Sequence, residues 1–124
     1  MYRIMVADDS WLQRKKIGKF LQTNGFEVIE AVNGKDAVEK SGVDMPDCIL
    51  LDLLMPEMDG IEVLRTFQQD GTSIPVIIFT ADIQDTSRAR CFELGATDFI
   101  NKPIDQDKML EAIQKILDIK GDKD

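Results

Sequence analysis

Three aspartates, one threonine and one lysine stand directly after short apolar segments of the sequence. Asp8 and Asp9 follow the first apolar segment, and Asp52 follows the third. Thr80 follows the fourth segment, and Lys102 comes just after the fifth. Two carboxylates 4 Å apart repel each other by about 4 kcal/mol at an effective dielectric constant near 20. If the fold brings these acids together, they need protons, a matching ammonium group or a bound cation.

The residue types present narrow the chemistry that this set can perform. The 124-residue sequence contains no histidine, and its two cysteines, Cys48 and Cys91, lie inside apolar segments. This excludes Ser-His and Cys-His nucleophile pairs, a histidine general base and a His-containing zinc site. We therefore expect a hard cation, Mg²⁺ with Mn²⁺ as the alternative, bound by carboxylates. Thr80 and Lys102 add a hydroxyl and a positive charge, so the set predicts a site for a phosphoryl group.

The charge of the chain excludes other functions. The formal net charge of −8 argues against nucleic-acid binding. The apolar runs are too short to cross a membrane, and Asp8 and Asp9 come too early for a signal peptide. We therefore expect a cytoplasmic protein without membrane insertion. The one dense basic run has a spacing typical of a solvated helix face: Arg14, Lys15, Lys16 and Lys19.

The elements that position these residues follow from the apolar pattern. Segments typical of buried parallel strands cover residues 2–7, 28–31, 47–51, 74–79 and 99–100. Amphipathic stretches lie between and after them, with apolar residues three and four apart. Ser10 and Asp105 are candidate helix N-caps. Four glycines are expected to end helices: Gly25, Gly71, Gly95 and Gly121.

Five βα units with short connections predict an α/β fold with an open, five-stranded parallel sheet and helices on both faces. We expect one domain over residues 1–120 and a short tail over residues 121–124. In such sheets, ligands bind outside the carboxyl ends of the strands. The five polar residues are therefore expected to meet at one edge of the sheet.

Over essentially its whole length the sequence resembles the receiver domains of response regulators in two-component signalling, of the chemotaxis (CheY-like) type. The resemblance rests on VADDS, LLDLLMPEMDG, Thr80-Ala81 and GATDFINKPI, in this order and spacing. It implies a flavodoxin-like (βα)5 fold with strand order 2-1-3-4-5. It also implies a signalling phospho-acceptor that catalyses only its own phosphorylation and dephosphorylation.

The resemblance assigns roles to the residues that match the family pattern. Asp52 would accept a phosphoryl group from a partner's phosphohistidine. Asp9, Asp52 and the backbone carbonyl of Leu54 would bind Mg²⁺, with Asp8 acting mainly through water. Lys102 would pair with the phosphoryl oxygens, and the peptide bond before Pro103 would be cis.

The resemblance further implies a switch and two residues that tune it. Thr80 would bind the new phosphoryl group and Phe99 would turn inward, remodelling the surface of the fourth helix, fifth strand and fifth helix for a protein target. Leu54 and Asp82 occupy the positions that set the phosphoryl lifetime. Asp82 could position an attacking water or be a solvated acid at a helix start. Phe99 could also be an ordinary core residue.

Several alternatives stay open from the sequence. The donor could be a sensor histidine kinase or a histidine phosphotransfer protein, which in relatives dock on the first helix and so on the basic run. The chain could be a stand-alone regulator, a monomer or weak dimer, or a receiver fragment of a longer regulator with an effector domain. A magnesium-dependent phosphohydrolase also uses an Asp nucleophile, but that class carries D-x-D after its first strand, where this chain has Asp8-Asp9-Ser10.

Overall fold

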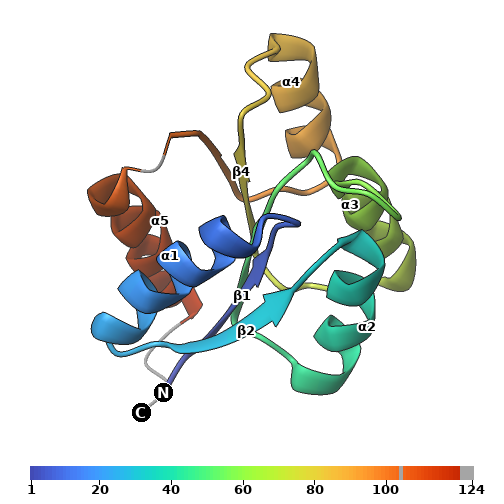
Figure 1. Ribbon diagram of the computed structural model, residues 1–124. Coiled ribbons are helices and arrows are strands. Elements are labelled where there is room, and N and C mark those ends of the chain that lie inside the picture. The colour runs from blue at the N-terminus through green and yellow to red at the C-terminus, as the bar shows by residue number, and fades with distance from the viewer. Residues whose placement is uncertain (104, 121–124) are drawn as a thin grey trace.

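Ten alternating strands and helices make up the computed structural model, which describes residues 1–103 and 105–120 (Figure 1). The predicted tail at 121–124, with Gly121, lies outside the described residues. The elements in chain order are β1 (Arg3–Ala7), α1 (Trp11–Thr23), β2 (Glu27–Ala31), α2 (Gly34–Asp44), β3 (Cys48–Leu51), α3 (Gly60–Asp70), β4 (Val76–Thr80), α4 (Asp85–Glu93), β5 (Asp98–Asn101) and α5 (Gln106–Lys120).

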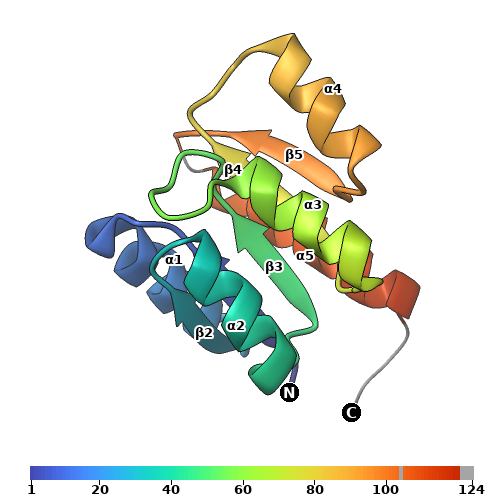
Figure 2. The same cartoon turned by 90° about the vertical axis from the view of Figure 1, so that its right-hand side faces the viewer.

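The five strands form one parallel sheet in the order β2-β1-β3-β4-β5, which confirms the predicted fold and strand order. Helices α1 and α5 cover one face, and α2, α3 and α4 lie on the other (Figures 1 and 2). All carboxyl ends of the strands therefore meet at one edge, which we call the carboxyl edge. The opposite edge, where the strands begin, is the amino edge.

Two apolar clusters hold the helices onto the sheet, one on each face. Residues of β3 and β4 alternate between them: Ile49 and Ile78 face α2 and α3, whereas Leu50 and Ile77 face α1 and α5. All of β3 and β4 is buried, as expected for central strands covered on both faces. Burying each such side chain contributes about 2 kcal/mol, so the carboxyl edge rests on a rigid frame.

Local signals in the sequence set several helix ends. The Ser10 side chain accepts a hydrogen bond from the Gln13 amide and caps α1. Gly71 ends α3 in the left-handed conformation, with φ of 71°, a geometry that glycine adopts without steric cost. The Asp105 carboxylate accepts from the Lys108 amide at 3.2 Å at the start of α5.

Strand ends differ from the predicted ranges by one or two residues. The predicted strand at 99–100 extends to Asp98–Asn101, and β4 includes Thr80. Asp98 pairs with Ile77, and Asn101 with Thr80, in the β4–β5 ladder. Backbone groups form this ladder whatever the side chain is, so polar residues at strand ends escape an apolar pattern.

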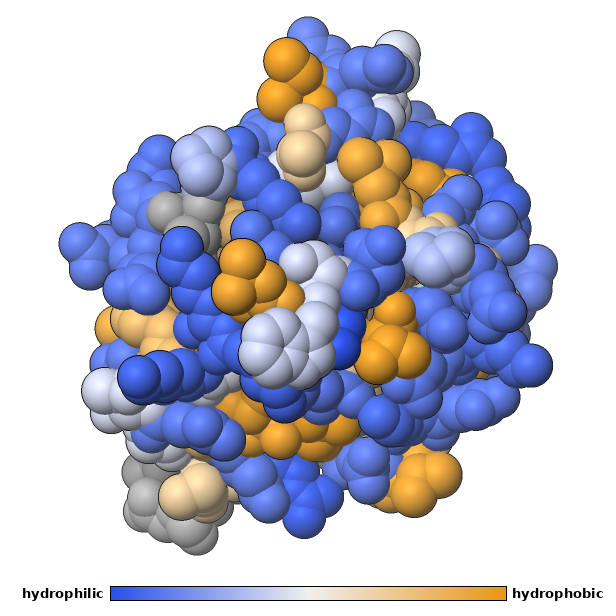
Figure 3. Space-filling model, viewed as in Figure 1, coloured by the Kyte–Doolittle hydropathy of each residue, from blue (hydrophilic) through white to orange (hydrophobic). Residues whose placement is uncertain are grey.

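Large apolar side chains are exposed in the first turn of α1 and in the connections that follow β2, β3 and β4. Figure 3 shows separate hydrophobic side chains among hydrophilic ones on the face turned toward the viewer. Trp11 and Leu12 begin α1, and the others lie within three residues of the end of a strand: Val32, Leu54 and Ile83. Within the described residues, no helix is long and apolar enough to span a membrane.

Candidate functional site

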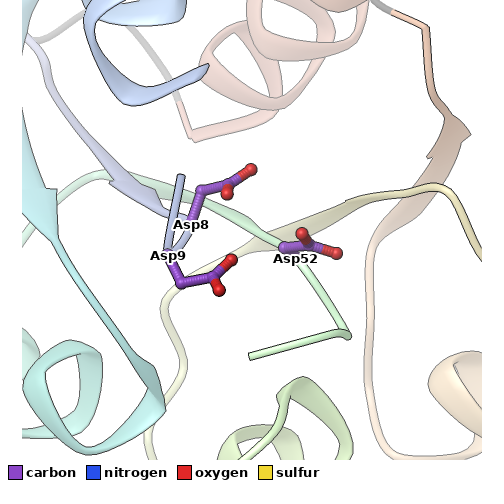
Figure 4. Close-up of side chains that lie close together, drawn as sticks. All are labelled: Asp8, Asp9 and Asp52. Carbon is purple, nitrogen blue, oxygen red and sulfur yellow. The ribbon is translucent and has the colours of Figure 1, made fainter. Parts of the chain in front are cut away.

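Three carboxylates meet at the carboxyl edge between β1 and β3. Asp8, Asp9 and Asp52 each offer a carboxylate oxygen, and these oxygens lie within 4.8 Å of one another. The side chains project from the ends of β1 and β3, which are neighbours in the sheet (Figure 4). Asp8 and Asp52 are buried, whereas Asp9 is exposed. The cluster is therefore a pocket with two acids at its base and one facing solvent.

The backbone fixes the two buried acids. The Asp8 amide donates to the Ala31 carbonyl at 3.2 Å, and the Asp52 amide donates to the Ala7 carbonyl at 3.0 Å, so both continue the sheet pairing. The Ser10 amide donates to Asp8 Oδ1 at 2.9 Å. The Leu54 amide donates to Asp52 Oδ1 at 3.2 Å. The second oxygen of each carboxylate, Oδ2, contacts the Lys102 side chain.

Lys102 supplies the positive charge of the pocket. Its Nζ lies 2.9 Å from Asp8 Oδ2 and 3.0 Å from Asp52 Oδ2. Burial lowers the pKa of Lys102, but the hydrogen bonds to Asp8 and Asp52 outweigh burial and leave the pKa above its ordinary value. The ammonium group is therefore charged at neutral pH. With one ammonium group for three carboxylates, the described residues leave the pocket negative.

Thr80 and Asp82 form the next layer of the site. The buried Thr80 hydroxyl accepts from the Asp82 amide at 3.3 Å. The Asp82 carboxylate accepts from the Gln84 amide at 2.9 Å and from the Ser87 hydroxyl at 2.7 Å, and these bonds lower the pKa of Asp82. In this structure both Asp82 oxygens are therefore occupied at the start of α4. Asn101 Nδ2 donates to the Asp82 carbonyl at 2.9 Å and joins this loop to β5.

Phe99 and Pro103 lie on either side of Lys102 in the sequence. Phe99 is buried, and the Arg88 guanidinium of α4 lies 5.5 Å from the centre of its ring. The same guanidinium lies 5.5 Å from the ring of Phe92. The Lys102–Pro103 peptide bond is cis.

The donor atoms of the pocket fit a hard divalent cation. Asp8, Asp9 and Asp52 present carboxylate oxygens, the ligands that Mg²⁺ prefers, on an open side where Mg²⁺ can keep some of its waters. The sequence has no histidine, and both cysteines are buried in the core. The arrangement can therefore bind Mg²⁺ and, beside it, an anionic group reached by Lys102.

Comparison with known proteins identifies the family. Residues 4–114 match the family model described as "Response regulator receiver domain". The chain belongs to the response-regulator receiver family. The receiver domain is 42% identical over 117 residues to the chemotaxis protein CheY of Bacillus subtilis, covering 94% of this chain and 98% of that protein.

Two further similarities are to a longer protein and to a chain in a protein complex. It is 32% identical to the response regulator MprA of Mycolicibacterium vanbaalenii, covering 93% of this chain but 50% of that protein. It also resembles a chain in the crystal structure of the CheX-CheY-BeF3-Mg²⁺ complex of Borrelia burgdorferi, with a TM-score of 0.87 and 30% identity, covering 93% of this chain and 88% of that chain. The chain is thus a receiver domain of two-component signalling, like CheY.

Two features of the receiver domain were missed by the sequence patterns. The first is Arg14, which is 8% exposed, whereas the rest of the basic run, Lys15, Lys16 and Lys19, is exposed. The expectation of a solvated face is therefore wrong for Arg14. The spacing contains the missed signal, because Arg14 lies three residues before Ile17 and shares its buried face of α1.

The second is the close contact that supports the loop between β3 and α3. A Cβ atom built on Gly34 would lie 1.8 Å from the Met58 carbonyl oxygen, so only glycine allows this approach. Glu57 and Met58 have φ of 48° and 84°, a conformation that costs free energy for residues with side chains. The Lys35 amide donates to the Glu57 carbonyl at 3.2 Å and holds the loop. The start of α2 therefore braces the loop that follows Asp52.

Proposed function

We propose that this receiver domain accepts a phosphoryl group on Asp52 from a phosphohistidine of another protein and then changes its affinity for a protein target. The observation that carries the proposal is the Lys102 ammonium group, which contacts both Asp8 and Asp52 in a pocket with a third carboxylate, Asp9. A buried nucleophile beside a fixed cation suits transfer of a group that bears three anionic oxygens.

In the proposed step, a carboxylate oxygen of Asp52 bonds to phosphorus while the P–N bond of the donor phosphohistidine breaks. The leaving imidazole nitrogen takes a proton from solvent, and Asp52 becomes an acyl phosphate. The Lys102 ammonium is held 3.0 Å from Asp52 Oδ2 and would follow the incoming phosphoryl oxygens. In this proposal the domain catalyses only its own phosphorylation and dephosphorylation.

We propose that Asp9, Asp52 and the backbone carbonyl of Leu54 bind Mg²⁺, or Mn²⁺ in its place, with Asp8 acting mainly through water. The fit rests on the carboxylate oxygens within 4.8 Å of one another. When bound, the cation neutralises charge on the phosphoryl oxygens. Asp8 meanwhile keeps its bond to Lys102 and so orients the ammonium group.

The switch that follows would run from Thr80 to Phe99. The acyl phosphate carries about −1.5 to −2 charges and three acceptor oxygens where the Asp52 carboxylate carried a charge of −1. The Thr80 hydroxyl would exchange its contact with the Asp82 amide for one with the phosphoryl group, drawing the loop toward Asp52. This loop leads into α4, whose Arg88 contacts the Phe99 ring, so the movement would reshape the α4-β5-α5 surface. To move the domain from a 1:99 to a 99:1 ratio of two states, the phosphoryl group must stabilise one state over the other by about 5.5 kcal/mol.

The proposed donor is a sensor histidine kinase or a histidine phosphotransfer protein. Trp11, Leu54 and Ile83 expose apolar side chains around the carboxyl edge, and a protein partner would cover them. The Borrelia burgdorferi relative is in a complex with CheX, which supports a protein as the target too. We further propose a cytoplasmic monomer or weak dimer that does not bind nucleic acid. Leu54 and Asp82 would set the phosphoryl lifetime.

The test is labelling with radioactive acetyl phosphate in the presence of Mg²⁺. The wild type is expected to take up label that alkali removes, as for an acyl phosphate, and Asp52→Asn is expected to show none. The matched control is Asp47→Asn, because Asp47 is 6% and Asp52 5% exposed and Asp47 lies at the amino edge. Labelling of Asp52→Asn at the wild-type level would contradict the proposal. Turnover of p-nitrophenyl phosphate would favour the phosphohydrolase alternative.

A further inference from the structure

Arg14 is a buried cation next to the acidic pocket, where it bonds to the backbone of Asp8 and not to the Asp8 carboxylate in the part of the chain that the structure describes. Its side chain is 9% exposed. Its Nη1 donates to the backbone carbonyl of Asp8 at 2.8 Å, and its Nε donates to Glu30 Oε1 at 3.1 Å. The guanidinium therefore ties the end of β1 to β2 from the side of the sheet that α1 covers.

Glu30, which accepts the hydrogen bond from Arg14 Nε, is itself held by two lysines. Lys15 Nζ donates to Glu30 Oε2 at 2.8 Å, and Lys40 Nζ donates to the Glu30 carbonyl at 2.6 Å. The hydrogen bond from Lys15, opposed by burial and helped by Arg14, lowers the pKa of Glu30. Lys15 thus holds the Glu30 side chain and Lys40 holds its backbone, so Glu30 is a fixed acceptor for the Arg14 guanidinium.

The Asp8 carbonyl belongs to the peptide unit that leads to Asp9. Because a peptide unit is planar, holding its oxygen fixes the direction in which the chain enters Asp9. Within the described residues, no group donates a hydrogen bond to the Asp9 carboxylate, although this side chain lies in the acidic cluster. Its direction therefore depends on the backbone that Arg14 holds.

We propose that Arg14 is a positioning residue that orients the Asp8–Asp9 peptide unit and thereby aims Asp9 at the cation site. This inference rests on the proposed function for the role of that site. Two simpler roles compete with it. Arg14 could only stabilise the fold, or it could act only through its charge.

The direction in which the Mg²⁺ Kd changes when Arg14 is replaced distinguishes these three roles. If Arg14 acted through charge alone, removing it would make the pocket more negative and tighten Mg²⁺ binding. If it only stabilised the fold, the folded protein would bind Mg²⁺ with an unchanged Kd. If it orients Asp9, Arg14→Met is expected to raise the Kd about tenfold, as for other groups that orient metal ligands.

The experiment titrates purified protein with Mg²⁺ and follows the fluorescence of Trp11, the only tryptophan, beside calorimetry. Arg14→Lys keeps one donor for the Asp8 carbonyl and is expected to recover most of the affinity. Glu30→Gln removes the charge of the support but leaves the carbonyl bond, so its Kd is expected to stay within about twofold of the wild type. A Kd of Arg14→Met that is unchanged or lower overturns the inference.

The matched control is Arg3→Met. Arg3 makes the same pair of contacts at the amino edge, with Nε 3.2 Å from Glu27 Oε2 and Nη1 2.8 Å from the Asp44 carbonyl. Its removal is expected to leave the Mg²⁺ Kd unchanged. A loss of affinity in both variants would show a general effect of stability and would also overturn the inference.

A second measurement needs no cation. In metal-free protein, NMR signals of the Asp8 carbonyl carbon and the Asp9 amide are expected to shift in Arg14→Met and to stay near wild type in Arg3→Met. Unchanged signals overturn the inference even if the wild type fails to bind Mg²⁺. That failure would instead count against the proposed function. If Arg14→Met does not fold, Arg14→Gln takes its place in both measurements.

Discussion

Charged residues at the amino edge and at the carboxyl edge of the sheet differ in the number of partners that they have. At the amino edge, the buried Asp47 accepts a hydrogen bond from the Arg3 amide at 2.8 Å, and the Arg3 guanidinium meets Glu27 and the Asp44 carbonyl. At the carboxyl edge, Asp8, Asp9 and Asp52 form a cluster of three carboxylates, and the Lys102 ammonium group pairs with Asp8 and Asp52. At the amino edge each of these charged groups has its own hydrogen-bond partner, whereas at the carboxyl edge three carboxylates share one ammonium group. An excess of charge that the fold maintains is a sign of a site for a ligand.

The largest expected effect follows from removing the ammonium group that pairs with Asp8 and Asp52 at the carboxyl edge. Lys102→Met leaves Asp8 and Asp52 buried without their cation and is expected to cost about 3 kcal/mol of unfolding free energy without Mg²⁺. Arg3→Met removes an exposed pair at the amino edge and is expected to cost less than about 1 kcal/mol. Urea denaturation in the presence of EDTA measures both. Equal losses would contradict the difference between the edges.

Added Mg²⁺ tests whether the unmatched charge binds a cation. At a Mg²⁺ concentration about 100 times its Kd, the unfolding free energy is expected to rise by about 2.7 kcal/mol, because the cation binds only the folded chain. Thermal unfolding at increasing Mg²⁺ measures this rise. Asp9→Asn is expected to lose most of it, and Asp47→Asn, altered at the amino edge, is expected to keep it. No rise in the wild type would contradict a cation site.

The effect of Asp9→Asn on the unfolding free energy is expected to reverse when no cation is bound. Asp9→Asn removes one of three like charges and is expected to stabilise the metal-free protein by about 1 kcal/mol, since the exposed carboxylate is partly screened. The gain should shrink in high salt. Urea denaturation in EDTA at low and high salt checks both points. A loss of stability at low salt would show that the carboxylates do not repel one another as described.

The smallest expected effect concerns Glu30 and its pH dependence. Its pKa lies below the ordinary value of 4.5, chiefly through the hydrogen bond from Lys15. A lowered pKa contributes stability that is complete above about pH 4.5 and is lost as the pH falls through the folded value. The stability difference between wild type and Glu30→Gln should therefore shrink in acid. A difference that grows in acid would contradict the assignment, and Glu27→Gln serves as the control at the amino edge.

Much of the frame can be predicted from the sequence because its signals are local. Apolar runs predict the buried strands, and a single serine or glycine caps a helix through contacts with its own neighbours. Strand ends such as Asp98 and Asn101 were missed because backbone pairing with another strand defines them. The contact of Gly34 with the Met58 carbonyl was missed for a similar reason, since it joins the start of α2 to a loop distant in sequence.

The sequence by itself determined which residue types stand at the strand ends, and therefore that carboxylates, a hydroxyl and an ammonium group share one edge. Only the tertiary structure decided how they meet. Lys102 contacts Asp8 across 94 positions and Asp52 across 50 positions of the chain. In the sequence Arg14 belongs to a basic run, whereas in the structure it is buried and donates a hydrogen bond to the Asp8 carbonyl. Periodicity describes one helix or strand at a time, whereas these contacts depend on strand order and on how each helix packs against the sheet.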